Sequence, residues 1–171
     1  MNMRRTLDAL YDGAAWLGAL FMIGTLVSVL AGVLDRQFAW SLRGTDMYAG
    51  YCMAASGFLA LAHTLKKGEH IRVTLILNGL RGSARRALEI WALAAATALS
   101  MLFAWYSVML SVNSYAYHDI STGNDATPLW IPQITMGVGA VILMIAFIDE
   151  LVLEIRGRRI QAGSDEALHH E

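Results

Sequence analysis

Four long stretches of the chain contain no Asp, Glu, Lys or Arg, and each is bounded by charged residues. Each stretch reaches the ~18–20 residues that a helix needs to cross the hydrocarbon layer of a membrane. Backbone N–H and C=O groups find no water in that layer, so the segments must be helical. The pattern therefore predicts an all-α membrane protein with four transmembrane helices, over about 13–34, 47–65, 90–114 and 128–148.

Lys and Arg are distributed unevenly between the segments that flank these spans. Eleven lie in the amino terminus, the second loop and the tail, against two in the first loop and none in the third. Because positive residues are retained on the cytoplasmic side, both termini are expected to be cytoplasmic. We expect residues 1–160 to form a single four-helix transmembrane domain, followed by a flexible cytoplasmic tail over 161–171.

The first stretch has an alternative interpretation as a cleaved signal peptide. Arg4 and Arg5 precede it, and Val29-Leu30-Ala31 loosely resembles a cleavage site. However, its uncharged length exceeds the about 7–15 residues of a signal core. Cleavage would also place the basic second loop outside the cell, so a retained helix is favoured.

Composition supports the membrane class. Of 171 residues, 56% are hydrophobic and only 16% are charged, and the mean hydropathy is +0.46. A soluble chain of this length cannot bury so much apolar surface, and disordered chains are far more polar. The net charge of −1 suggests no nucleic-acid partner. The single cysteine, Cys52, excludes an internal disulfide.

Candidate chemistry within the spans is sparse. His63 is the one histidine inside a predicted span, whereas haem held between helices usually takes two axial ligands. We interpret His63 as a polar residue at the membrane boundary. Ionisable residues in the membrane mark ion paths and substrate sites, and the spans contain no Asp, Glu, Lys or Arg. We expect no catalytic residue, metal or cofactor, and no ion translocation by this chain alone.

The loop between the second and third spans is strongly basic. As a helix it would place Leu77 and Leu80 on one face and Arg81 and Arg85 on the other. Such an amphipathic segment suits the inner membrane surface, where Arg81, Arg85 and Arg86 would meet anionic lipid or a partner. A plain basic loop is the alternative.

Small residues recur at every fourth position of the predicted spans. The third span carries the longest series, formed by Ala92, Ala96, Ser100 and Ala104. Such series let helices approach closely in a membrane. They serve either packing within this chain or docking to another membrane protein, and both alternatives stay open.

Two motifs of the chain resemble those of one family, the small DctQ-type membrane subunits of tripartite ATP-independent periplasmic (TRAP) transporters. The first motif follows the second span and consists of Gly68, Glu69, His70, Ile71, Arg72 and Val73. The second precedes the fourth span and includes Pro128, Trp130 and Pro132. The chain departs from the family pattern at Thr74, where an acidic residue is frequent, and at the start of the second span, where only Asp46 is acidic.

The resemblance implies a location, partners and a role. The location would be the bacterial inner membrane, and the partners a large multi-span subunit, a periplasmic substrate-binding protein and membrane lipids. The large subunit of such systems carries organic acids by a sodium-coupled elevator motion, and the small subunit braces its scaffold. A stand-alone four-helix membrane protein, such as an integral membrane enzyme or assembly factor, is the alternative function.

Overall fold

The computed structural model describes residues 2–38, 40, 42–67 and 83–157. Four long helices account for most of them, and the prediction of an all-helical chain is confirmed for this part. Within it, β pairing is limited to an isolated bridge between Ile120 and Pro128. The helices are α1 (Asn2–Phe38), α2 (Thr45–Lys66), α4 (Ser83–Ala116) and α5 (Trp130–Ile155).

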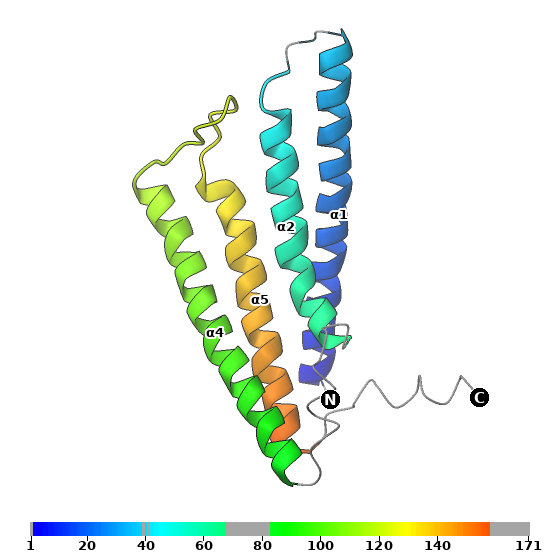
Figure 1. Cartoon of the computed structure of the whole chain (residues 1–171), viewed down its shortest axis with the longest axis vertical. Helices are drawn as coiled ribbons and strands as arrows, with labels where there is room; N and C mark the ends of the chain where they lie inside the picture. Colours follow the sequence, from blue (N-terminus) through cyan, green and yellow to red (C-terminus); the bar gives the residue numbers. More distant parts are fainter. Residues whose placement is uncertain (1, 39, 41, 68–82, 158–171) are drawn as a thin grey trace, which may run out of the picture.

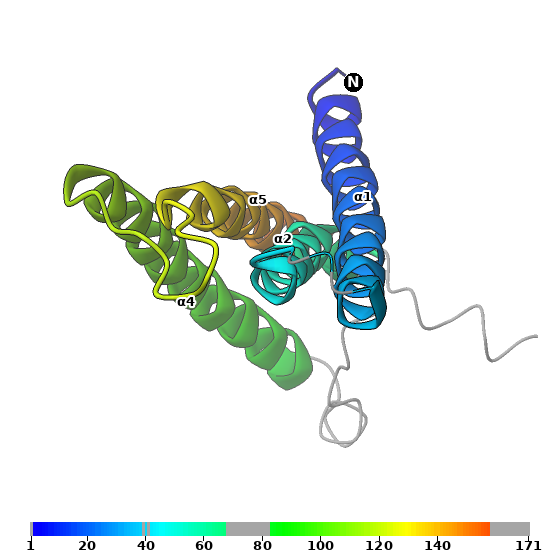
Figure 2. The same ribbon diagram turned by 90° about the horizontal axis from the view of Figure 1, so that it is seen from above.

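The helices run alternately up and down, so their ends gather at two levels (Figure 1). We call the level where α1 and α4 begin the proximal end, and the level where α2 and α5 begin the distal end. In section, α1 packs along α2, α2 along α5, and α5 along α4. The view from above shows α1 and α4 at opposite edges of this layer (Figure 2). Two hairpins, α1–α2 and α4–α5, therefore meet along a seam between α2 and α5.

Three of the described helices are long and apolar enough to cross a membrane, namely α1, α4 and α5. α2 covers the second predicted span, but its central stretch is less apolar than those of the other three helices, because tyrosines, glycines and His63 are interspersed among its apolar residues. Its crossing of the membrane stays a prediction. All four helices extend beyond their uncharged stretches at one end or both, α2 by only one or two residues, because a helix whose end carries charged residues can continue into water.

Close packing at the seam depends on a glycine of α5. A Cβ atom added to Gly139 would lie 2.6 Å from the backbone oxygen of Phe58 in α2. A larger residue there would force the backbones of the two helices apart. Toward the proximal end, the seam continues into a core of buried residues from three helices, which consists of Tyr11, Ala14, Ala62, Leu65, Ile142 and Ala146.

Candidate functional site

Polar side chains join the two hairpins at each end of the seam. We call the proximal group of Lys66, Asp149 and Glu150 the proximal clamp. We call the distal group of Tyr51, Ser121 and Asp125 the distal clamp. Each links α2 to the α4–α5 hairpin across more than 65 residues of sequence.

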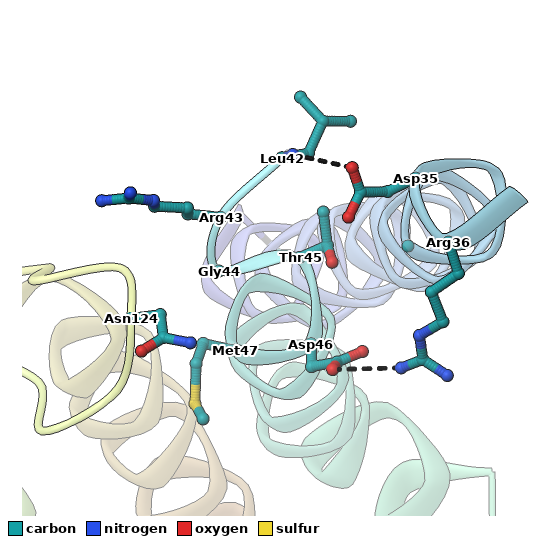
Figure 3. Close-up of a pocket in the computed structure, with 10 residues that line it drawn as sticks. Asp35, Arg36, Leu42, Arg43, Gly44, Thr45, Asp46, Met47 and Asn124 are labelled. Atoms are coloured by element: carbon teal, nitrogen blue, oxygen red, sulfur yellow. Dashed lines mark hydrogen bonds and ion pairs between the residues drawn. The ribbon is translucent and has the colours of Figure 1, made fainter. Parts of the chain in front are cut away.

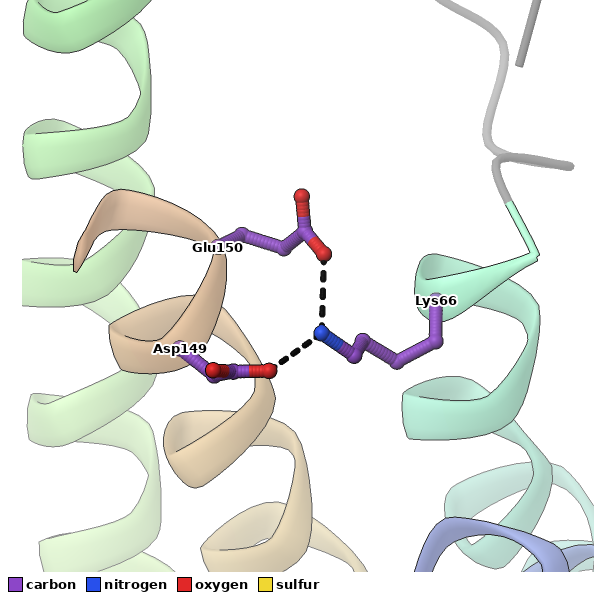
Figure 4. Close-up of polar contacts among 3 residues, drawn as sticks. All are labelled: Lys66, Asp149 and Glu150. Atoms are coloured by element: carbon purple, nitrogen blue, oxygen red, sulfur yellow. Dashed lines mark hydrogen bonds and ion pairs between the residues drawn. The ribbon is translucent and has the colours of Figure 1, made fainter. Parts of the chain in front are cut away.

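The proximal clamp joins the last residue of α2 to the carboxyl-terminal part of α5 (Figure 4). The ammonium group of Lys66 donates to Asp149 Oδ2 and, at 3.0 Å, to Glu150 Oε1. The side chain of Lys66 is only 15% exposed and that of Glu150 only 10%. Charges in such a desolvated position are stable only when they are paired. The clamp therefore fixes the proximal ends of α2 and α5 to each other.

Side chains of α1 and α4 extend this proximal network. The Lys66 ammonium lies 5.5 Å from the centre of the Tyr11 ring in α1, a distance at which a cation is attracted to the ring. His63 Nδ1 lies 3.3 Å from Asp12 Oδ1. From α4, Arg86 donates to the carbonyl oxygen of Ile155 at 3.1 Å, which satisfies an end group of α5. All four helices thus contribute to the proximal end.

The distal clamp joins α2 to the loop between α4 and α5. The Tyr51 hydroxyl donates to Asp125 Oδ2 at 3.1 Å and lies 3.0 Å from Ser121 Oγ. The loop is held in shape by a hydrogen bond of 2.8 Å from the N–H of Ser121 to the carbonyl of Thr127. Gly44, at the start of α2, lies against this loop. Its position requires glycine, because its φ is +82° and an added Cβ would lie 2.6 Å from Asp125 Cβ.

Hydroxyl groups around Asp125 favour its charged form. The side chains of Thr127, Ser121 and Tyr51 hold the pKa of the Asp125 carboxyl below its ordinary value, and desolvation opposes them only in part. The carboxylate is therefore the form that holds the distal clamp together.

A polar pocket of about 400 Å³ opens beside the distal clamp, between the end of α1 and the start of α2 (Figure 3). Its charged side chains are partly paired. The N–H of Leu42 donates to Asp35 Oδ1 at 2.8 Å, and Arg36 pairs with Asp46 at 3.4 Å. The Arg36–Asp46 pair is solvent-exposed, and such pairs contribute little to stability.

Some of the predicted site residues lie outside the described part of the chain, and the others take part in local contacts. Arg81 and the motif from Gly68 to Val73 lie outside the described residues, as do the amphipathic segment up to residue 82 and the tail, whereas Arg85 and Arg86 belong to α4. Arg85 pairs with Glu89 at 3.2 Å, one helical turn away. Trp130 begins α5 and packs edge to face on Tyr115 of α4, with ring centres 5.7 Å apart. Pro132 lies in the first turn of α5, and Pro128 pairs with Ile120 in the loop.

The series of small residues in α4 serves packing within the chain over half of its length. Ser100 and Ala104 are buried on the face of α4 that packs along α5. Ala92 is exposed and Ala96 is half-buried. Only the proximal part of the series is thus open to a partner.

Sequence reasoning missed both clamps. Lys66 and Asp149 were visible only as charges that bound two different spans on the same predicted side. Nothing in the pattern showed that α2 and α5 are neighbours. Among the described residues, no group of three or more His, Cys, Asp or Glu is arranged to hold a metal ion.

The architecture defines the class, which is an α-helical membrane protein whose polar contacts join helices. A comparison with protein families identifies the family within this class. The family model of the DctQ component of tripartite ATP-independent periplasmic transporters matches residues 25–157, well over half of the chain, and the chain belongs to this family. A comparison with curated proteins found no match.

Proposed function

We propose that this chain is the small membrane subunit of a sodium-coupled, binding-protein-dependent transporter for organic acids. In this role it braces the static scaffold of a large elevator-type subunit in the bacterial inner membrane. A periplasmic binding protein delivers the substrate. Membership of the DctQ family supports the tripartite arrangement.

The observation that carries the bracing role is the pair of clamps at the two ends of one helix seam. Hairpins joined at a single point can rotate about it, whereas hairpins joined at two distant points resist rotation. The proximal clamp and the distal clamp hold α2 against the α4–α5 hairpin in this way. A partner that moves a substrate domain across the membrane requires such a fixed element beside it.

The distribution of charge supports a role away from the transport path. Asp, Glu, Lys and Arg lie near the ends of the four helices, and their middle parts contain none. Transport sites for ions and carboxylates usually place ionisable or unwound elements at the membrane centre. The chain therefore acts on transport through its partner.

Reconstitution in proteoliposomes tests this function. The large subunit, the binding protein and this chain together should take up an organic acid when a sodium gradient is imposed. Omission of this chain should abolish or strongly reduce uptake, and this chain alone should transport nothing. Sodium-independent uptake, or full uptake without this chain, would contradict the proposal.

Substitution of polar residues in the spans provides a second test. His63→Ala and Ser100→Ala should leave the sodium dependence of uptake unchanged in complexes that remain intact. A change in sodium stoichiometry in either variant would place the chain on the transport path instead.

A further inference from the structure

Five tryptophans are distributed along the chain, and four of them lie near the ends of the spans predicted from the uncharged stretches or just outside them. Trp16, Trp40, Trp91 and Trp130 each follow a charged residue by two to five positions. This is the usual place of tryptophan, at the boundary between membrane and water.

Trp105 differs from the other four in its depth. It lies only three residues beyond the middle of the span predicted over 90–114, which corresponds to about 5 Å along the helix axis. Tyr106 follows directly. Helical side chains lean toward the amino-terminal end of their helix, so both rings lean toward the middle of the span and away from the distal water layer.

Both residues face outward from the protein. The exposed fraction is 69% for Trp105 and 63% for Tyr106. Within the described part of the chain, neither the indole N–H nor the phenol O–H makes a hydrogen bond. In hydrocarbon these polar groups have no water to replace a protein partner, so lipid alone is an unfavourable neighbour for them.

The two rings flank a continuous apolar strip on α4. Consecutive residues of a helix project about 100° apart, so Leu102 and Met109 lie between Trp105 and Tyr106 around the helix. Both are exposed. This face points away from the buried residues Ser100, Ala104 and Ser107 that pack along α5.

The outer face of α1 at the same depth is chemically different. Its exposed side chains there include Leu20, Ile23 and Val27, which are purely aliphatic. Lipid chains are sufficient neighbours for these side chains, because they carry no polar group that needs a hydrogen-bond partner. The two edges of the helix layer in Figure 2 therefore differ in whether they require a protein partner.

We infer that the α4 face formed by Leu102, Trp105, Tyr106 and Met109 is the surface on which the large subunit packs a transmembrane helix. This inference rests on the proposed function. That helix presents a hydrogen-bond acceptor, such as a side-chain oxygen, to the indole N–H or the phenol O–H. The aliphatic face of α1 contacts lipid.

A photo-crosslinking residue tests the location of the contact. Benzoylphenylalanine replaces Leu102 or Ile23 in the full chain, which is co-produced with the large subunit in its own membrane. The two sites are matched, since each lies at the middle of its predicted span and their exposed fractions are 57% and 58%. Light should join position 102, and not position 23, to the large subunit.

The other outcomes separate this inference from the proposed function. Adducts with the large subunit from position 23 alone would overturn the inference and leave the subunit role intact. Adducts at position 102 with only lipid, or only with a second copy of this chain, would also overturn it. Failure of the unmodified chain to co-purify with the large subunit would overturn both.

Removal of the two polar atoms tests the chemistry. At least one of the variants Tyr106→Phe and Trp105→Phe should weaken the complex about three- to twentyfold, the range for hydrogen bonds between membrane helices. The thermal stability of the isolated chain should not change, because both side chains are exposed. Tyr117→Phe, at the end of α4, is the matched control and should leave the dissociation constant unchanged. Equal dissociation constants for Tyr106→Phe, Trp105→Phe and wild type would contradict the assigned hydrogen bonds.

Discussion

At the scale of single residues, Gly139 determines how closely α2 and α5 approach. Gly139→Ala should destabilise the chain by about 1–3 kcal/mol, the usual cost of overpacking, because the added methyl group meets the backbone of Phe58. The free energy of unfolding in mixed detergent micelles measures this effect.

Gly57→Ala is the control for Gly139→Ala. Gly57 lies in the middle of α2 with no atom within 4 Å of an added Cβ, so alanine should be neutral or slightly stabilising there. Equal losses of stability in the two variants would show that contact of the added methyl group with Phe58 is not the cause.

Asp125 makes the distal clamp sensitive to acid. Its pKa is lowered in the folded chain, so the unfolded chain binds the proton more readily. The stabilisation is therefore complete above the ordinary Asp pKa of about 3.9 and is lost as the pH falls through the lower folded value. The difference in melting temperature between wild type and Asp125→Asn should be constant near neutral pH and shrink below about pH 4. A difference that persists unchanged in acid would contradict this role of the carboxylate.

At the scale of helices, the proximal clamp holds the end of α2 against the last turns of α5. Lys66→Met should destabilise the chain by about 1–3 kcal/mol, because it leaves the Asp149 carboxylate desolvated without Lys66. Lys67→Met is the matched control, since Lys67 is the adjacent lysine and its side chain is exposed. Chemical unfolding of both variants measures the comparison. Equal effects would mean that a general loss of positive charge matters, and not the clamp.

Hydropathy predicted the positions of the helices well and their lengths poorly. A segment that lies in the hydrocarbon layer must pair its backbone groups internally and is therefore helical. For this reason α1 and α5 appear where their uncharged stretches predict them. Hydropathy does not indicate where a helix ends once it has left the membrane. The charged segment from Ser83 to Glu89 continues α4 by two turns beyond the predicted span.

The neighbour relations of the helices could not be read from the pattern. Lipid-facing and protein-facing sides are both apolar in a membrane, so the sequence did not distinguish the seam of α2 and α5 from the outer faces. The clamps depend on that neighbour relation. This is why Lys66 and Asp149 were recognised as boundary charges and not as partners.

At the scale of the whole molecule, the charge asymmetry predicts the orientation in the membrane. On a Cys52→Ala background, a cysteine at Asn124 in the distal loop should react with an impermeant reagent added outside the cell. A cysteine at Arg156, at the proximal end, should react only after the membrane is opened. Both side chains are exposed, so a reversed pattern would mean that the termini face outward.

The clamps also have a consequence for the order in which the chain is made. Lys66 and Tyr51 belong to the first hairpin, whereas Asp149 lies 83 residues after Lys66 and Asp125 lies 74 residues after Tyr51. During synthesis, the first hairpin enters the membrane with both side chains still without these partners. A chain that stops before residue 149 leaves Lys66 without its two carboxylate partners. Completion of the last helix is therefore the step that joins the two hairpins at the proximal end, and a truncated chain differs from a finished one in the charge left unpaired there.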